Sequence, residues 1–203
     1  MKADNITAVI LAGGRATRMG GQDKGLLEVA GKSIVARIAS QLSEQVSKIL
    51  INANRNQDEY EKLGYPVIND SLSNYQGPLA GMAAALAKID TEWLLTVPCD
   101  GPFVAKDYAV RMMQVAEEQS VKLVVASDAD RIQPVYALIH IQLLPSMQAF
   151  LKSGERKIDR WYAQHPYSIV EFRDREQMFT NINTPEQLAA TEDSLKKHNS
   201  NRV

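Results

Sequence analysis

The amino-acid sequence predicts an α/β fold with three layers, in which a mainly parallel sheet has helices on both faces. The first observation behind this prediction is a series of short apolar runs of the kind that form fully buried strands. The second is that segments with helical spacing of apolar residues lie between these runs, and such alternation is typical of parallel sheets. The predicted strands are Ile6–Leu11, Lys48–Asn52, Pro66–Ile68, Trp93–Val97 and Lys122–Ala126.

The helices are predicted from the same periodicity. The Gly31-Lys32-Ser33 segment indicates the entry to a helix. That helix presents one apolar face, made of Ile34, Val35, Ile38, Ala39, Leu42 and Val46. Two more helices are expected at Gly81–Ile89 and Asp107–Glu118.

The last third of the chain is less regular. Gln133–Leu138 is predicted to be a strand with Pro134 near its start, and Gln142–Leu151 to be a helix. Thr184-Pro185-Glu186-Gln187 has an N-cap residue, a proline at the first helical position and a capping-box glutamine. A terminal helix should therefore run from Pro185 to about Lys197, followed by a frayed tail. With no repeat or linker, we expect one domain, residues 1–203.

Composition excludes several classes of protein. The 203 residues contain 23 Lys+Arg and 24 Asp+Glu, so no net charge favours nucleic acid or an anionic membrane. No apolar run approaches the roughly 20 residues of a membrane span. The first residues lead directly into a strand, which leaves no room for a signal peptide, and the lone Cys99 fits a reducing cytoplasm. The three histidines have no metal-ligand spacing, so a structural zinc site is not expected.

The most informative segment is the glycine-rich stretch from Leu11 to Lys24, which follows the first predicted strand. Its glycines, among them Gly13 and Gly14, let backbone N–H groups approach phosphate oxygens, and Arg18 and Lys24 add positive charge. A plain turn from strand to helix needs only about two to six residues, so a triphosphate loop is the better interpretation.

Two familiar phosphate loops are excluded by spacing. Gly13-Gly14 is followed by five residues other than glycine, which does not match the dinucleotide pattern G-x-G-x-x-G. Gly31-Lys32-Ser33 resembles the end of a P-loop, but the glycine required at position 26 is Leu26.

Three polar residues follow predicted strands: Asn52, Asp70 and Asp100. The carboxyl ends of parallel strands meet at one edge of a sheet, so these residues and the glycine-rich loop should converge there. Asp100 is a natural ligand for Mg²⁺, which takes one or two carboxylates together with phosphate oxygens and waters. Alone, Asp100-Gly101 is equally typical of a turn; the nearby glycine-rich loop favours the metal.

The loop pattern Leu-Ala-Gly-Gly followed by Arg-Met-Gly and Lys24 resembles the signature of nucleotidyltransferases with a Rossmann-like GT-A fold. The doubled Gly20-Gly21 and Asp23–Leu27 narrow this resemblance to the molybdenum cofactor guanylyltransferases, which join GMP to molybdopterin. Matching segments lie along the whole chain: Asn52–Arg55, Asp70–Leu72, Gly77–Met82, Pro98–Asp100 and Asn181–Glu186.

The resemblance implies a role for each candidate site residue. Lys24, Asp100 and Arg18 would be catalytic, and Asp100 would hold Mg²⁺, the expected cofactor. GTP would contact Leu11, Ala12, Gly13, Gly14, Lys24, Asn52, Asp70, Gly77, Gly81 and Asp100. Two structural alternatives stay open: Asn52 could be a turn residue at a strand end, and Asp70 could be a helix cap. Sequence spacing alone does not exclude either alternative.

The second substrate, molybdenum-molybdopterin, is expected on the C-terminal half, opposite a nucleotide-binding N-terminal half. Gly154–Lys157 would meet the anionic pterin or form a turn between helices. Asn181 and Asn183 would approach the metal or phosphates, or form a strand–cap junction. The sequence departs from the family pattern at two places that bear on the second substrate rather than on GTP. Gln133-Pro134-Val135 matches the family's pterin-side segment only inexactly. Gly101 follows Asp100 where the family often has a larger residue, which predicts a looser turn.

No protein nucleophile is required for this chemistry, because molybdopterin's own phosphate, with a second pKa of about 6, is the attacking group. Catalysis would consist of positioning and electrostatics. Two alternatives remain: a related enzyme that uses CTP on molybdopterin or a nucleotide on a sugar phosphate, and a non-catalytic nucleotide-binding adaptor that delivers the cofactor. We expect a monomer in transient contact with cofactor-delivery proteins or molybdoenzymes.

Overall fold

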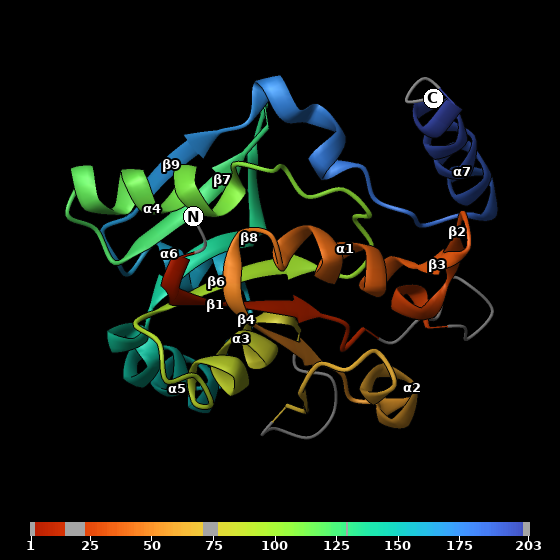
Figure 1. Ribbon diagram of the computed structural model, residues 1–203. Helices are drawn as coiled ribbons and strands as arrows, with labels where there is room; N and C mark the ends of the chain where they lie inside the picture. Colours follow the sequence, from red (N-terminus) through yellow and green to blue (C-terminus); the bar gives the residue numbers. More distant parts are fainter. Residues whose placement is uncertain (1–2, 15–22, 71–76, 129, 201–203) are drawn as a thin grey trace.

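A computed structural model of the chain describes residues 3–14, 23–70, 77–128 and 130–200. Within these residues a seven-stranded sheet has the order β5-β4-β1-β6-β8-β7-β9 (Figure 1). Its strands are β1 (Ala3–Leu11), β4 (Val46–Asn52), β5 (Val67–Ile68), β6 (Trp93–Pro98), β7 (Leu123–Ser127), β8 (Ile132–His140) and β9 (Ser168–Glu171).

Most neighbouring strands in this sheet are parallel. β1 pairs in parallel with β4 and β6, β4 with β5, and β7 with β9. Only β8, among the described strands of this sheet, is antiparallel to its neighbours, β6 and β7. The predicted mainly parallel sheet is therefore confirmed, and each predicted strand lies within or overlaps an observed one.

Helices cover both faces of the sheet, as predicted. In β1, Ile6, Ala8 and Ile10 enter one hydrophobic core, whereas Val9 and Leu11 enter the other. The first core is closed by α1 (Ile34–Leu42) and α4 (Tyr108–Glu118), and the second by α3 (Pro78–Leu86), α5 (Leu144–Lys152) and α6 (Ile158–Tyr162). Figure 1 shows α1 and α4 above the sheet and α3 and α5 below it.

The helix α1 begins where the sequence predicts. The Ser33 hydroxyl accepts a hydrogen bond from the Ala36 N–H at 3.2 Å, which satisfies one free amide of the first turn. The predicted apolar face is buried from Ile34 to Leu42, but the prediction that Val46 belongs to the same helix face is wrong. Val46 is the first residue of β4, because the helix ends at Leu42 and a short turn follows.

Other boundaries differ from the predictions by a few residues. α3 begins at Pro78 and ends at Leu86, so both limits lie earlier than the predicted Gly81–Ile89. The predicted helix at Gln142–Leu151 is divided into a 3-10 turn, η2 (Ile141–Leu143), and α5. The sequence analysis did not identify several short elements: η1 (Lys24–Leu26), the hairpin β2 (Glu28–Val29) and β3 (Lys32–Ser33), α2 (Gln57–Glu61), α6, β9 and η3 (Arg173–Phe179).

The C-terminal helix α7 (Pro185–Ser200) has the predicted capping box. The Thr184 hydroxyl accepts from the Gln187 N–H at 3.3 Å, and the Gln187 side chain accepts from the Thr184 N–H at 3.1 Å. The helix extends to Ser200, past the predicted end near Lys197. It packs beside the β2–β3 hairpin, which brings the C-terminal helix next to the segment that follows η1 (Figure 1). No described helix is long and apolar enough to cross a membrane.

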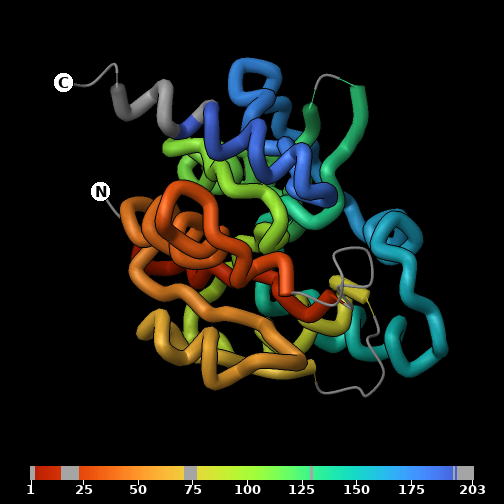
Figure 2. The backbone as a smooth tube through the Cα atoms, turned by 90° about the vertical axis from the view of Figure 1, so that its right-hand side faces the viewer, coloured from red at the N-terminus to blue at the C-terminus, as the bar shows by residue number. Residues whose placement is uncertain are grey.

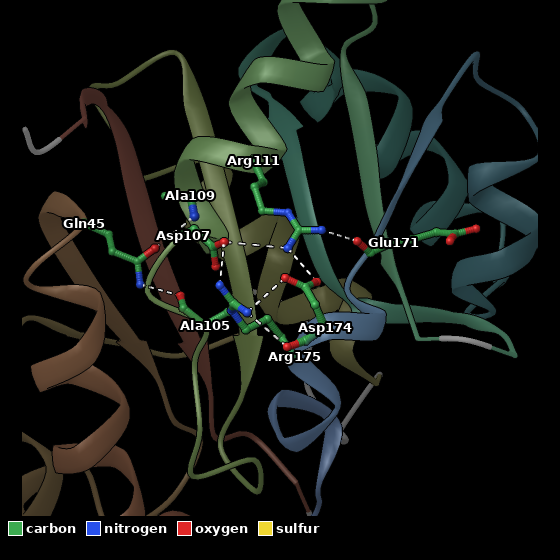
Figure 3. Close-up of polar contacts among 8 residues, drawn as sticks. All are labelled: Gln45, Ala105, Asp107, Ala109, Arg111, Glu171, Asp174 and Arg175. Atoms are coloured by element: carbon green, nitrogen blue, oxygen red, sulfur yellow. Dashed lines mark hydrogen bonds and ion pairs between the residues drawn. The ribbon is translucent and has the colours of Figure 1, made fainter.

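Two glutamines of the α1 region fix the segment that leads from β6 to α4. The Gln41 side chain donates to the Pro102 carbonyl and accepts from the Val104 N–H, both at 2.9 Å. The buried Gln45 donates to the Ala105 carbonyl at 2.9 Å and accepts from the Ala109 N–H at 3.0 Å (Figure 3). These side chains supply backbone partners that a segment without regular structure lacks.

An ion-pair network joins α4 to the chain that follows β9 (Figure 3). Arg111 pairs with Asp174 at 2.9 Å, and Arg175 pairs with Asp107 at 3.3 Å and with Asp174 at 2.9 Å. The Arg111 guanidinium also lies 4.2 Å from the centre of the Phe172 ring. Exposed pairs contribute little individually, but this network orients η3, which continues toward residues 181–183.

We expect Gln45→Met to destabilise the protein by about 2 kcal/mol, since the Ala105 carbonyl and the Ala109 N–H would lose their partner in a buried setting. Urea unfolding with a common m-value measures this change. Gln119→Met, at an exposed helix end, is the matched control and should stay near wild type. Equal urea midpoints for the two variants would show that the Gln45 hydrogen bonds do not stabilise the segment that leads into α4.

Candidate active site

The carboxyl ends of the parallel strands meet at one edge of the sheet, as expected. Just past the ends of these strands, backbone hydrogen bonds still join the neighbouring segments. Ala12 donates to the Asn52 carbonyl at 2.8 Å, and Cys99 donates to the Leu11 carbonyl at 3.1 Å. Ala53 donates to the Ile68 carbonyl at 2.8 Å. Figure 2 looks onto this edge, where segments from the beginning and the end of the chain lie opposite each other.

The first group of side chains at this edge consists of Asn52, Asn54 and Asp70. The two Asp70 carboxylate oxygens each accept an amide N–H, one from Asn52 at 3.0 Å and the other from Asn54 at 2.8 Å. The Asp70 N–H returns a hydrogen bond to the Asn54 side-chain oxygen at 2.9 Å. Asn52 is 2% exposed, so its orientation is fixed by the protein. A carboxylate has about four lone-pair directions, so Asp70 retains acceptor capacity for a ligand.

Two of the predicted glycines frame Asn52. A Cβ atom at Gly13 would lie 2.9 Å from the Asn54 amide nitrogen and 3.3 Å from the Asn52 side-chain oxygen. A Cβ at Gly81 would contact the same Asn52 oxygen too closely, and would lie 2.9 Å from Leu11. Both positions therefore favour glycine, because the backbone passes directly against the side chain of Asn54 at Gly13 and against that of Asn52 at Gly81.

Gly14 and Gly77 have a different setting. A Cβ at either residue would meet open space within the described part of the chain. Gly77 has φ +81° and caps α3, so it needs the left-handed region that glycine adopts without strain. The Gly14 carbonyl accepts from the Arg55 guanidinium at 3.4 Å. Gly14 and Gly77 stand at the limits of the segments 15–22 and 71–76, and Arg18 lies outside the described residues.

The second group brings Lys24 to Asp100. The Lys24 ammonium lies 3.5 Å from an Asp100 carboxylate oxygen and donates to the Asn183 side-chain oxygen. The side chains of Lys24 and Asp100 are 20% and 23% exposed, so both reach solvent at the site. The sequence predicted that the glycine-rich loop and Asp100 meet at one edge, whereas the direct pairing of Lys24 with Asp100 was not predicted. Asn183 comes from a segment 159 positions further along the chain.

The donor set around Asp100 fits Mg²⁺. The Ile182 N–H donates to the Asp100 carbonyl at 2.8 Å, which holds the 181–183 segment beside the carboxylate. The side-chain oxygens of Asn181 and Asn183 thus accompany one carboxylate, and oxygen atoms of these kinds are what Mg²⁺ prefers. Among the described residues no group of three His, Cys, Asp or Glu side chains could hold a metal alone. Such a site needs phosphate oxygens to complete the coordination.

Cys99 lies between β6 and Asp100, directly beside the site. Burial raises the pKa of the Cys99 thiol well above its ordinary value, and the charge of Asp100 raises it further. A thiol that stays protonated near neutral pH does not attack phosphorus.

The expected looser turn at Gly101 is wrong. Gly101 is buried, and a Cβ there would collide with the hydroxyl of Tyr136. That hydroxyl donates to the Met178 carbonyl at 2.8 Å. Tyr136 therefore fills the space that a larger residue after Asp100 would need, and the turn is close-packed.

The pterin-side predictions remain untested. Gly154–Lys157 forms the turn between α5 and α6, with Gly154 at φ +92°. The Arg156 guanidinium donates to the Leu151 carbonyl at 2.7 Å, which is a structural role at the end of α5. The Pro134 carbonyl accepts from the Tyr162 hydroxyl at 2.6 Å, which anchors the Gln133-Pro134-Val135 segment to α6.

The sequence analysis missed two contributors to the site. Asn54 lies two residues after Asn52, and only its place in the same motif pointed to it. Tyr136 gave no signal, because a tyrosine in an apolar strand is normally a core residue.

We expect Gly101→Ala to destabilise the protein by about 1–3 kcal/mol through overpacking against Tyr136. Tyr136→Phe removes the colliding oxygen, at a cost of about 1 kcal/mol for the lost hydrogen bond to Met178. In the Tyr136→Phe background, Gly101→Ala should lose most of its penalty. Urea unfolding of the wild type, the two single variants and the double variant measures this coupling, with Gly14→Ala as the control in open space. Additive penalties would show that Tyr136 is not the obstacle.

Comparison with known proteins gives the chain its family. Residues 8–169 match the model of the MobA-like NTP transferase domain. A molybdenum cofactor guanylyltransferase of Shewanella frigidimarina is 51% identical over 185 residues, which covers 91% of this chain and 94% of that protein. One from Shewanella pealeana is 49% identical over 185 residues, with 91% and 92% covered.

The fold has solved counterparts as well. The crystal structure of molybdopterin-guanine dinucleotide biosynthesis protein A from Archaeoglobus fulgidus superimposes with a TM-score of 0.76 at 20% identity, covering 94% of this chain and 99% of that one. At this identity the likeness concerns the fold, whereas the family follows from the domain match and the close relatives. The chain is therefore a nucleotidyltransferase of the MobA-like NTP transferase family, and within that family it belongs to the molybdenum cofactor guanylyltransferases.

Proposed function

We propose that the enzyme transfers GMP from GTP to the phosphate of molybdenum-molybdopterin, which gives molybdopterin guanine dinucleotide and pyrophosphate. The observation that carries this proposal is the joint position of two groups at one sheet edge. Asn52 and Asp70, beside close-packed glycines, form a hydrogen-bonded polar pair suited to a base, and Lys24 and Asp100 form a charged pair suited to phosphates. The names of the relatives at about half identity specify guanine.

The guanine is assigned to the polar pair of Asn52 and Asp70. A carboxylate accepts from the guanine N1–H and exocyclic amine, while an amide both donates and accepts. The backbone of Leu11, Ala12 and Gly13 passes beside these side chains, since Ala12 is hydrogen-bonded to Asn52. Gly77 and Gly81, at the start of α3, would contact the nucleotide from the other side.

The triphosphate is assigned to the loop that follows β1. Gly13 and Gly14 expose their backbone at its start, and Lys24 places an ammonium at its end. Arg18 would add a second cation from within the loop. Fixed cations near the bridging oxygen stabilise the negative charge that develops on the pyrophosphate as it leaves.

Asp100, with the Asn181 and Asn183 oxygens, would hold a Mg²⁺ ion. When bound, this ion neutralises phosphate charge and so lowers the barrier to transfer. In the reaction, an oxygen of the molybdopterin phosphate forms a bond to the α-phosphorus of GTP. The bond from that phosphorus to the bridging oxygen breaks, and pyrophosphate takes the electron pair. The attacking phosphate is already ionised, so the protein needs no general base and contributes position and charge.

The pterin is assigned to the C-terminal half, opposite the nucleotide. The segment with Asn181 and Asn183 lies beside Asp100, so a second phosphate could approach from that side. Gln133-Pro134-Val135 and Gly154–Lys157 are the further candidates on this half. The single domain would act as a monomer in the cytoplasm and pass its product to cofactor-delivery proteins or molybdoenzymes.

The alternatives have less support. A non-catalytic adaptor would not need a lysine and an aspartate directed at each other beside the phosphate loop. An enzyme for CTP or for a sugar phosphate would fit the fold equally well, but the close relatives bear the guanylyltransferase name. Competition between GTP, CTP and ATP in a pyrophosphate-release assay with molybdenum-molybdopterin tests the assignment, and an equal rate with all three would remove it.

The role of Asp100 can be tested by Asp100→Asn, which keeps size and hydrogen bonding but removes the charge. We expect pyrophosphate release to fall by about 100-fold or more, by comparison with the loss of one preorganised charge-stabilising group. Raising Mg²⁺ should recover only part of the rate. Asp90→Asn, which alters an exposed ion pair with Lys48, is the control and should keep full activity. Wild-type metal dependence in Asp100→Asn would mean that the ion binds elsewhere.

The role of Asp70 can be tested by comparing how the Asp70→Asn variant binds GTP and ATP. In Asp70→Asn one acceptor oxygen is replaced by a donor, so either guanine or the Asn52–Asn54 pair loses a partner. A buried group without a partner costs about 1–3 kcal/mol, so the Kd for GTP should rise by about 5-fold to 150-fold. Calorimetric titration with GTP and ATP measures this, with Asp58→Asn on the exposed side of α2 as the control. An equal loss for both nucleotides would exclude a role in reading the base.

A further inference from the structure

Asp23, the residue before the catalytic lysine, has a buried carboxylate with no function in the scheme above. It is 9% exposed. One of its oxygens accepts from the Tyr60 hydroxyl at 2.6 Å and from the Gly25 N–H at 3.3 Å, and the other accepts from the Asn56 side chain at 3.3 Å. In the described part of the chain these donors are uncharged, and no ion pair includes Asp23.

The partners of Asp23 are themselves held firmly. Tyr60 is completely buried on α2, and burial raises the pKa of its hydroxyl above the ordinary value, with the nearby Cys99 and Asp23 adding to this. The hydroxyl therefore remains a donor near neutral pH. Asn56 stands at the beginning of α2 with φ +50°. Asp23 thus joins the end of the phosphate loop to the helix that follows the base-reading strand β4.

The residue on the other side of Lys24 is fixed as well. A Cβ at Gly25 would lie 2.6 Å from the Tyr60 hydroxyl and 2.7 Å from Val35 of α1. Only a glycine allows the backbone this close to both elements. The Leu26 and Leu27 N–H groups donate to the carbonyls of Asp23 and Lys24 at 3.1 and 3.2 Å, which closes the turn η1. The backbone of Lys24 is therefore fixed from both sides, while its side chain reaches Asp100.

We propose that Asp23 is a positioning residue for Lys24: through Tyr60, Asn56 and the Gly25 N–H, its carboxylate fixes the lysine backbone so that the ammonium meets the phosphates beside Asp100. This inference rests on the proposed function. Because misplacement of a catalytic group by about 1 Å can cost 100-fold in rate, loss of this anchor should reduce turnover without any contact between Asp23 and a substrate.

The test is a double-mutant cycle with Lys24. In Asp23→Asn the side chain presents an N–H where the wild type has only acceptors, and kcat for pyrophosphate release should fall by about 10-fold or more. In the Lys24→Ala background, where the lysine is gone, the same substitution should change the remaining rate by less than about 3-fold. Single-turnover measurements at high enzyme concentration keep the slow variants measurable. Equal losses in both backgrounds would overturn the proposal, because a residue that only maintains the fold would act in each.

Two further variants serve as a second test of the same anchor and as a control. Tyr60→Phe removes only the shortest hydrogen bond to Asp23 and should give a smaller loss that also disappears in the Lys24→Ala background. It decides the question if thermal unfolding shows that Asp23→Asn does not fold. Asp58→Asn, on the same helix but exposed, should keep the wild-type rate in both backgrounds.

Failure of the proposed reaction is distinguishable from failure of this inference. If the wild type releases no pyrophosphate from GTP, the proposed function is wrong, and the same cycle is measured as GTP affinity by calorimetry. If Asp23→Asn weakens GTP binding in the wild type but not in the Lys24→Ala background, Asp23 positions Lys24. If the loss of GTP affinity is the same in both backgrounds, the proposal is rejected.

Discussion

The parallel pairing of β1 with β4 on one side and β6 on the other is the constraint on which the site depends. Because the three strands run in the same direction and in register, Leu11, Asn52 and Pro98 end at the same level of the sheet. The hydrogen bonds of Ala12 to Asn52 and of Cys99 to Leu11 extend this alignment one residue beyond the strands. Asn52, the glycine-rich loop and Asp100, to which the proposed function assigns the base, the phosphates and the metal, therefore begin from fixed backbone positions.

The features that the sequence predicts are those with local signals. Apolar runs located the buried strands, and the N-cap of α1 and the capping box of α7 marked two helix starts with their own hydrogen bonds. Convergence of Asn52, Asp70 and Asp100 followed from strand direction alone. The reversed direction of β8 could not be predicted this way, because Gln133–Leu138 has the same apolar pattern in either direction.

What the sequence did not predict depends on contacts between distant segments. Gly101 suggested a loose turn, yet the Tyr136 hydroxyl from another strand fills its space. Val46 continued a helical pattern but begins β4, because pairing with β1 outweighs helix periodicity at that point. Gln41, Gln45 and Asp23 are polar residues of unremarkable types, and only their partners show that they hold the segments carrying Asp100 and Lys24.

The contact between Lys24 and Asn183 spans 159 positions of the chain. A polypeptide that emerges from the ribosome with its N-terminus first can pair β1 with β4 and bring Asn52 to Asp70 before Asn183 has been synthesised. The amide oxygens that accompany Asp100 arrive only when the segment before α7 has been synthesised and has docked. The part of the sheet edge built by β1 and β4 can therefore form first during synthesis, and Lys24 and Asp100 gain their partners from residues 181–183 only later.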